Sequence, residues 1–231
     1  MDANQYVFVH GMRRTRSVLE RWGENPGPVV GTWVLGAMLI ALGLLGAVTV
    51  VASLLKPDYG FTYTPSIPHG SEVGRVLTVM GRNSLVLALH AVACIAGFIA
   101  GATLPLSAER RTGLSKVIHE KARPIAFGWV IAVTCFSLIT QALALGLVGS
   151  TIAWDVGISV PLLVLTALPH ALLELTAVFL PLAAWTIASR RGDWDQLLAA
   201  TVVTVAIAIP MLLVAATWEV HVWPYILRAV S

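Results

Sequence analysis

The sequence predicts an all-α fold, a polytopic membrane bundle with five transmembrane helices. The first observation is composition, because the 231 residues are 57% apolar and only 12% charged, against about 25% charged in ordinary globular proteins. The second is that five charge-poor apolar runs are long enough to cross a hydrocarbon core of about 30 Å. The third is that the charged residues gather between these runs. Together these observations indicate an integral membrane protein.

The chain divides into three parts in sequence order. A polar segment, 1–27, carries four arginines and precedes the first apolar run. The predicted transmembrane domain covers 28–218, and a short tail covers 219–231. The expected spans lie at about 28–55, 84–106, 124–148, 160–187 and 197–218.

The longest predicted extracytoplasmic loop is segment 56–83, between the first two spans. Its first half is rich in proline, glycine and tyrosine and is typical of irregular structure. Its second half has apolar residues at helical spacing, which predicts an amphipathic helix over 72–82 on the membrane surface. The residues that carry this pattern are Val73, Val76, Leu77 and Met80.

The positive charge of the connecting segments predicts the orientation of the chain. Segments 1–27, 107–123 and 188–196 together hold eleven Lys and Arg residues, whereas the alternate set of segments holds four. Because cytoplasmic loops carry an excess of Lys and Arg, the N-terminus is expected in the cytoplasm and the C-terminus outside. The basic residues flank apolar spans, so they suit membrane lipid, and no nucleic-acid partner is expected.

Three ionisable residues are expected at membrane depth, where each is costly and needs a reason. Glu174 is the only Lys, Arg, Asp or Glu inside a predicted span. His170 lies four residues before it, on the same face of a helix, so the two side chains can meet. Pro169 precedes this pair and frees a backbone carbonyl near it. The third residue, His90, lies in the second predicted span.

Three interpretations of these residues remain open. In the first, His170 and Glu174 are a buried polar pair that pins the fourth span against its neighbours. In the second, His90 joins them in a zinc site, since histidine and carboxylate are ordinary zinc ligands. In the third, the pair titrates and handles protons or ions. Apart from this weak metal candidate, the sequence predicts no cofactor.

Small residues mark a helix-packing face in the second span. Gly97 and Gly101 form a Gly-x-x-x-Gly pair, which permits close approach by another helix. That helix belongs either to the same chain or to a second copy in a homodimer. Tight packing within the chain is the more common outcome for such pairs.

Several of these features resemble the stage II sporulation protein M family of membrane proteins. The resemblance rests on five spans, on Asn83 at the start of a glycine-spaced second span, and on the element Leu-Pro-His170-Ala-Leu-Leu-Glu174. It implies a membrane scaffold that anchors and localises partners, which in spore formers are peptidoglycan-degrading proteins. It also implies that the chain lies in the plasma membrane of a bacterium or archaeon. By the same resemblance, His170 and Glu174 are the family's buried polar pair.

The sequence therefore predicts a membrane scaffold or assembly subunit, with no enzymatic activity of its own. Its expected partners are membrane or extracytoplasmic proteins, such as peptidoglycan hydrolases or an ATP-binding cassette protein. The expected partner surfaces are segment 56–83 and the aromatic stretch 220–225, although aromatic residues there also suit a membrane-interface belt. The alternatives are a small transporter or permease subunit that uses the His/Glu pair, and an intramembrane zinc hydrolase.

Overall fold

The computed structural model describes residues 3–57, 71–103 and 114–231, and every regular element within these residues is a helix. The predicted all-α fold class is therefore confirmed for this part of the chain. The elements are α1 (Ala3–Glu24), α2 (Pro26–Leu54), α3 (Glu72–Phe98), the π-helix η1 (Ile99–Thr103), α5 (Leu114–Val156), α6 (Val160–Arg191), the 3-10 helix η2 (Trp194–Gln196), α7 (Leu197–His221) and α8 (Trp223–Val230).

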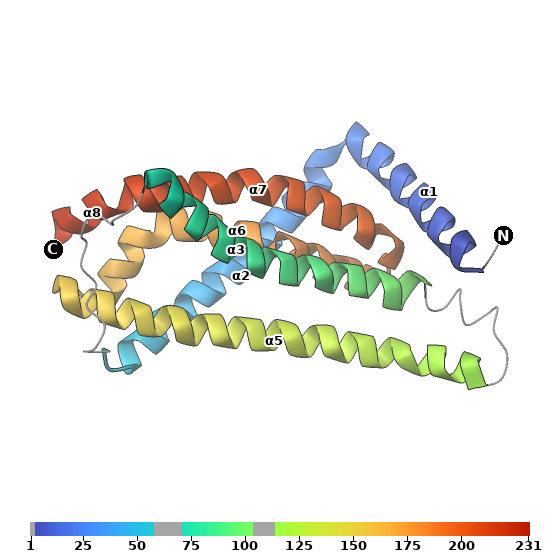
Figure 1. The fold of residues 1–231 in the computed structure, drawn as a ribbon, viewed down its shortest axis with the longest axis horizontal. Helices are drawn as coiled ribbons and strands as arrows, with labels where there is room; N and C mark the ends of the chain where they lie inside the picture. The colour runs from blue at the N-terminus through green and yellow to red at the C-terminus, as the bar shows by residue number, and fades with distance from the viewer. Residues whose placement is uncertain (1–2, 58–70, 104–113) are drawn as a thin grey trace.

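Within the described residues, five helices are long and apolar enough to cross a membrane. These candidate spans are Pro26–Leu54, Glu72–Gly101, Phe127–Val156, Val160–Arg191 and Trp194–His221. Each corresponds to one predicted span, which confirms the predicted number. Consecutive spans run in opposite directions, and the bundle therefore has an α1 end and, opposite it, an α8 end (Figure 1).

The second span extends further than the apolar run suggested. The expected surface helix at 72–82 and the span predicted from residue 84 form one continuous helix, α3. No proline interrupts it, and the Ser71 hydroxyl caps its start by accepting a hydrogen bond of 3.1 Å from the Gly74 amide. Most of the loop that precedes it, 58–70, lies outside the described residues.

Three other predicted segments also contain more helix than expected. The third predicted span, 124–148, is the middle part of α5, which continues to Leu114 and to Val156. In the polar segment 1–27, residues 3–24 form α1 and α2 begins at Pro26. The tail at 219–231 contains the end of α7 and all of α8. Helix α1 is stabilised by an exposed pair between Arg16 and Glu20, which lie 2.9 Å apart one helical turn from each other.

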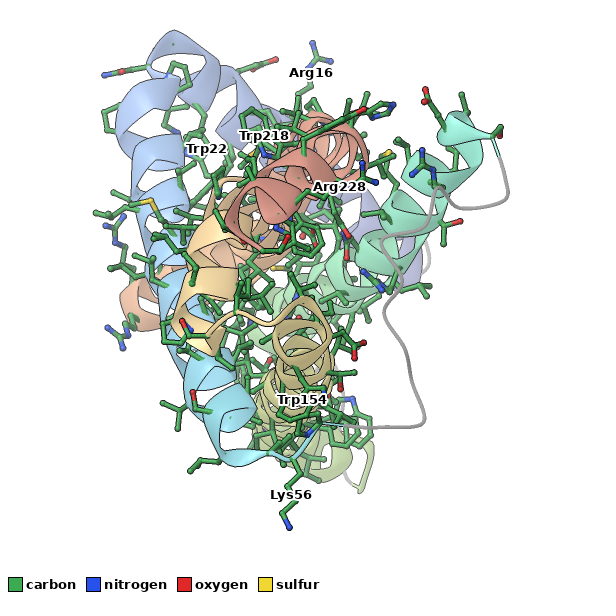
Figure 2. All side chains as sticks on the ribbon, turned by 90° about the vertical axis from the view of Figure 1, so that its left-hand side faces the viewer. Arg16, Trp22, Lys56, Trp154, Trp218 and Arg228 are labelled. Atoms are coloured by element: carbon green, nitrogen blue, oxygen red, sulfur yellow. The ribbon has the colours of Figure 1, made fainter. Side chains whose placement is uncertain are left out.

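Helix α6 is the centre of the bundle, and it packs against α2, α3 and α7. Figure 1 shows it between these helices, whereas α5 runs along one side of the bundle. All ten residues from Leu175 to Ala184 are buried, so α6 is enclosed on every side over this stretch. At the periphery, the charged side chains of Arg16 and Lys56 point away from the bundle (Figure 2).

The two glycines of the predicted packing face both lie against tryptophans of the same chain. A Cβ atom at Gly97 would lie 2.5 Å from the Trp185 indole nitrogen, and one at Gly101 would overlap the Trp194 side chain. Since real Cβ atoms do not approach that closely, only glycine fits at either position. The Gly-x-x-x-Gly pair thus serves packing within the chain, between the end of α3 and the segment from α6 to η2.

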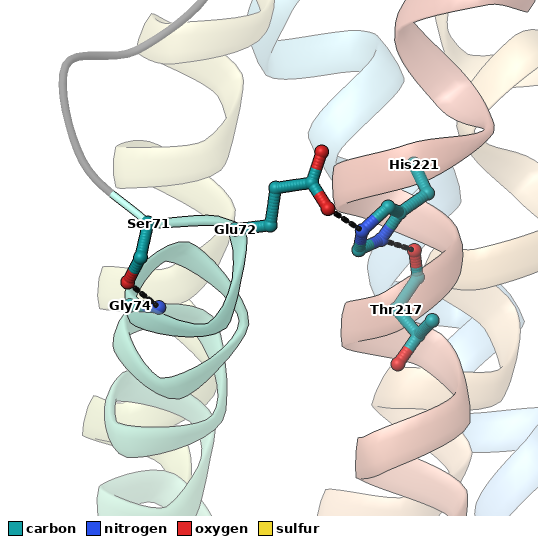
Figure 3. Close-up of polar contacts among 5 residues, drawn as sticks. All are labelled: Ser71, Glu72, Gly74, Thr217 and His221. Carbon is teal, nitrogen blue, oxygen red and sulfur yellow. Dashed lines mark hydrogen bonds and ion pairs between the residues drawn. The ribbon is translucent and has the colours of Figure 1, made fainter.

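The α8 end is closed by contacts between segments distant in the sequence. Glu72 at the start of α3 lies 3.3 Å from the His221 Nε2 atom at the end of α7, while His221 Nδ1 lies 3.0 Å from the Thr217 carbonyl (Figure 3). Beyond this point α8 continues from α7 and lies against the turn between α5 and α6. There, its fully buried Leu227 packs against Ile152 and Leu163.

Candidate functional site

The predicted pair of His170 and Glu174 lies on α6, but no hydrogen bond or ion pair between the two is found in the described structure. The His170 side chain is buried, and its Nδ1 atom has no hydrogen-bond partner. Its ring instead lies 5.4 Å from the Trp223 ring of α8, at a tilt of 53°. Helical spacing permits the two side chains to meet, yet each turns toward a different neighbour.

Glu174 faces a polar cluster formed with two other helices. The Asn83 amide of α3 lies beside its carboxyl group, and Arg82 of α3 and Glu219 of α7 are within electrostatic range. Arg82 also acts on Glu219. We refer to Arg82, Asn83, Glu174 and Glu219 as the polar cluster. It connects the three helices at the point where α6 changes from partly exposed to fully enclosed.

Charge within the polar cluster is unbalanced, because two carboxyl groups face one guanidinium group. Glu174 and Glu219 are half-buried, whereas Arg82 is exposed and Asn83 is buried. The Asn83 Nδ2 atom has no acceptor within hydrogen-bond distance. Two like charges brought together away from water repel each other. The arrangement therefore suits proton sharing or attraction of a cationic group better than permanent ion pairing.

His90 lies in a separate place, deeper in the bundle and away from the polar cluster. Its Nδ1 atom is 3.1 Å from the Val178 carbonyl of α6, and its ring packs edge-on against Phe179 at 5.2 Å. Because a carbonyl only accepts hydrogen bonds, Nδ1 donates here. The Nε2 atom is buried and has no partner. His90 therefore connects α3 to α6.

The Val178 carbonyl that His90 contacts lies about one turn before a second proline of α6, Pro181. Pro181 has no amide hydrogen to offer the Ala177 carbonyl, so the regular hydrogen-bond ladder is interrupted beside Val178. Cys94 of α3 reaches the same region, and its thiol donates to the Pro181 carbonyl at 2.9 Å. Two side chains of α3 thus bind backbone carbonyls of α6 at Pro181 and about one turn before it.

The predicted zinc site is not formed by His90, His170 and Glu174. In the described ranges no three His, Cys, Asp or Glu side chains gather closely enough to hold a metal ion. The physical reason is the position of His90, which contacts residue 178, two helical turns along α6 from His170. The zinc interpretation is therefore wrong for these three residues.

Pro169 lies within α6 and is exposed, directly before the His170 side chain that turns toward α8. One turn earlier, the Thr166 hydroxyl accepts a hydrogen bond of 3.2 Å from the Trp223 indole and donates one of 2.7 Å to the Leu163 carbonyl. The tail is thereby fixed to the first turns of α6. Of the aromatic residues expected to face a partner, Trp223 is turned inward and Tyr225 is 70% exposed.

Sequence reasoning missed two charged members of the polar cluster. Glu174 is not the only such residue within a span, because the candidate spans of α3 and α7 include Arg82 and Glu219. Both were placed in loops because the predicted spans ended at the edge of each apolar run. The residues Glu-Val-His that follow Trp218 were the available signal, since they continue the helical pattern of α7 to His221.

Fold and site together indicate a multi-pass helical membrane protein with a polar cluster at the junction of three candidate spans. Comparison with known proteins adds no assignment to a family: no protein-family model matches the chain, and no curated protein or solved structure is significantly similar to it.

Proposed function

We propose that this chain is a membrane scaffold or assembly subunit that anchors partner proteins at the plasma membrane. The observation that carries the proposal is the enclosure of α6 from Leu175 to Ala184. Large, fully buried side chains fill this part of the bundle, among them Phe179 and Leu180 of α6 and Leu212 of α7. Such packing fixes the relative positions of helices and leaves the polar cluster bounded on its inner side by apolar residues.

The hydrogen bonds of buried side chains also support a structural role for the bundle. In the enclosed part, His90 and Cys94 bind backbone carbonyls of α6 and so hold two helices together. The resemblance to the stage II sporulation protein M family favours the same class of function. The partners proposed are extracytoplasmic or membrane proteins, with peptidoglycan hydrolases and ATP-binding cassette proteins as the two classes to examine.

Affinity isolation of the tagged chain from native membranes after mild cross-linking tests this function. A scaffold should recover at least one other protein in stoichiometric amount, identified by mass spectrometry. Tyr225→Ala, which removes an exposed ring near the α8 end, should reduce recovery if the tail contributes to the contact. Leu165→Ala, also at an exposed position, is the matched control. Repeated recovery of the chain alone would contradict the scaffold function.

A permease subunit is the second candidate, and one observation favours it. Glu174 and Glu219 approach each other from two spans, with Arg82 nearby, as expected of groups that exchange protons or cations. In proteoliposomes, a flux carried by these groups should be lost in Glu174→Gln and in Glu219→Gln. Glu20→Gln, at an exposed pair on α1, is the control. Absence of flux in the wild type, or flux unchanged in both variants, excludes this candidate.

A further inference from the structure

A small cavity lies at the α1 end of the bundle, far from the polar cluster. It is about 60 Å³ in volume and lies between α1, the first turns of α2, the last turns of α6, and the start of α7. One water molecule needs roughly 10–15 Å³ by the same measure, so the cavity has room for a larger group. The residues that give it chemical character are Trp22, Thr32, Trp33, Arg191, Asp193 and Gln196.

One positive and one negative side chain line this cavity. Arg191 is exposed in the last turn of α6, and Asp193 follows directly after the turn at Gly192, whose φ of 76° ends the helix. In the part of the chain that the structure describes, neither Arg191 nor Asp193 has a side-chain hydrogen bond or ion pair. A guanidinium and a carboxylate that share a cavity without pairing are available for a ligand with both signs of charge.

The remaining wall of the cavity suits the cationic part of such a ligand. Trp22 and Trp33 line it together, with ring centroids 5.0 Å apart in an edge-to-face arrangement. Indole faces attract ammonium groups, and tryptophan is favoured where one side of a residue is apolar and the other is wet. Gln196 adds an amide able to donate to an anion. The Thr32 hydroxyl already donates to the Val29 carbonyl at 2.8 Å.

The location of the cavity indicates where such a ligand comes from. Its lining residues are at the ends of candidate spans, at Arg191 of α6 and in the first turns of α2 and α7. Lipid head groups lie at this level, and basic pockets between spans are known to hold them. We propose that the cavity binds the head group of a phosphatidylethanolamine. Its phosphate contacts Arg191 and Gln196, and its ammonium contacts Asp193 and the indoles.

Native mass spectrometry of the full chain in detergent tests this proposal. The protein is titrated with phosphatidylethanolamine, with phosphatidylglycerol of the same acyl chains, and with soluble phosphoethanolamine. Wild-type protein should retain one phosphatidylethanolamine in preference to phosphatidylglycerol, which lacks the ammonium. If soluble phosphoethanolamine displaces the bound lipid at a similar concentration, the ligand of the cavity is a free phosphate ester and not a lipid head group.

Two adjacent arginines provide a matched pair of variants. Arg191→Gln should weaken binding about tenfold, as expected for loss of a charge-assisted hydrogen bond. Arg190→Gln, one residue away and not part of the cavity lining, should change it less than about twofold. Asp193→Asn should retain the lipid but reduce the preference over phosphatidylglycerol.

Two outcomes overturn the proposal. The first is equal binding of the two lipids by the wild type, a result that does not depend on whether any variant folds. The second is equal weakening by Arg191→Gln and Arg190→Gln, which would mean that general positive charge attracts the lipid and the cavity does not.

Discussion

The two parts of α6 use polar atoms in opposite ways. From Leu175 to Ala184 the helix is enclosed, and side chains of α3 bind its carbonyls at Val178 and Pro181. From Val160 to Glu174 it is partly exposed, and although the Thr166 hydroxyl is hydrogen-bonded there, the His170 Nδ1 atom has no partner. Because an unpaired buried polar group costs stability, the first part is built for folding and the second retains groups free for another role.

The largest expected effect is in the enclosed part, at the close approach of α3 and α6. Gly97→Val should lower the free energy of unfolding by about 3 kcal/mol, because its Cβ would lie 2.5 Å from the Trp185 indole nitrogen and 3.1 Å from Leu197. Denaturation in mixed detergent measures it. Gly43→Val is the control, since nothing lies within 4 Å of a Cβ there. Equal losses in both variants would show that helix propensity alone is responsible.

Removing a fully buried ring from the same part should have the next largest effect. Phe179→Ala should destabilise the bundle by about 2 kcal/mol, since a cavity costs about 24 cal/mol per Å³ even where lipid removes most of the transfer term. Leu165→Ala, in the partly exposed portion of α6 and 63% exposed, should change stability by less than about 0.5 kcal/mol. If the order of the two is reversed, α6 is not enclosed as described.

The two histidines test the comparison directly. His90→Phe should cost about 1 kcal/mol, because it removes the hydrogen bond that joins α3 to the Val178 carbonyl of α6. His170→Phe should be neutral or slightly stabilising, because it removes a nitrogen that has no partner. Thermal unfolding of both variants in one detergent gives the difference. A larger loss of stability in His170→Phe than in His90→Phe would mean that the His170 imidazole has a structural partner.

The smallest expected effect concerns the charge balance of the polar cluster. Glu174→Gln should raise the free energy of unfolding by about 0.5 kcal/mol, because it relieves repulsion from Glu219. Arg82→Gln should lower it by a similar amount, since Arg82 offsets both carboxyl groups. Chemical denaturation at low and high salt measures these changes, and screening should reduce both. A lower free energy of unfolding in Glu174→Gln than in the wild type would show that Glu174 is mainly held by Arg82.

Hydropathy predicted the number of spans because each helix that crosses lipid must itself supply the apolar residues. It did not predict the helix ends, since α3 and α7 continue past the apolar runs through Arg82 and Glu219. The neighbours of Glu174 were also beyond prediction. Spacing along one helix identifies His170 as a possible contact of Glu174. That Glu174 instead lies near residues of α3 and α7 depends on how the three helices pack.

The same limit applies to the glycines and to His90. The Gly-x-x-x-Gly pattern predicted close packing, but tryptophans fill the space instead of the backbone of a second helix. His90 was grouped with His170 and Glu174 because all three are ionisable within spans. Its actual partner is the Val178 backbone carbonyl. Every residue has a backbone carbonyl, so the sequence does not indicate which one a side chain will bind.

Helix α5 is much longer than its candidate span, so its first turns lie well outside that span. Its 43 residues make a rod of about 65 Å, roughly twice the thickness of a hydrocarbon core. Its candidate span begins only at Phe127, so the turns from Leu114 onward stand about 20 Å clear of that span. A protein held by those first turns would be kept at a fixed height above the membrane. Inserting or deleting one helical turn there would change that height by about 5.4 Å.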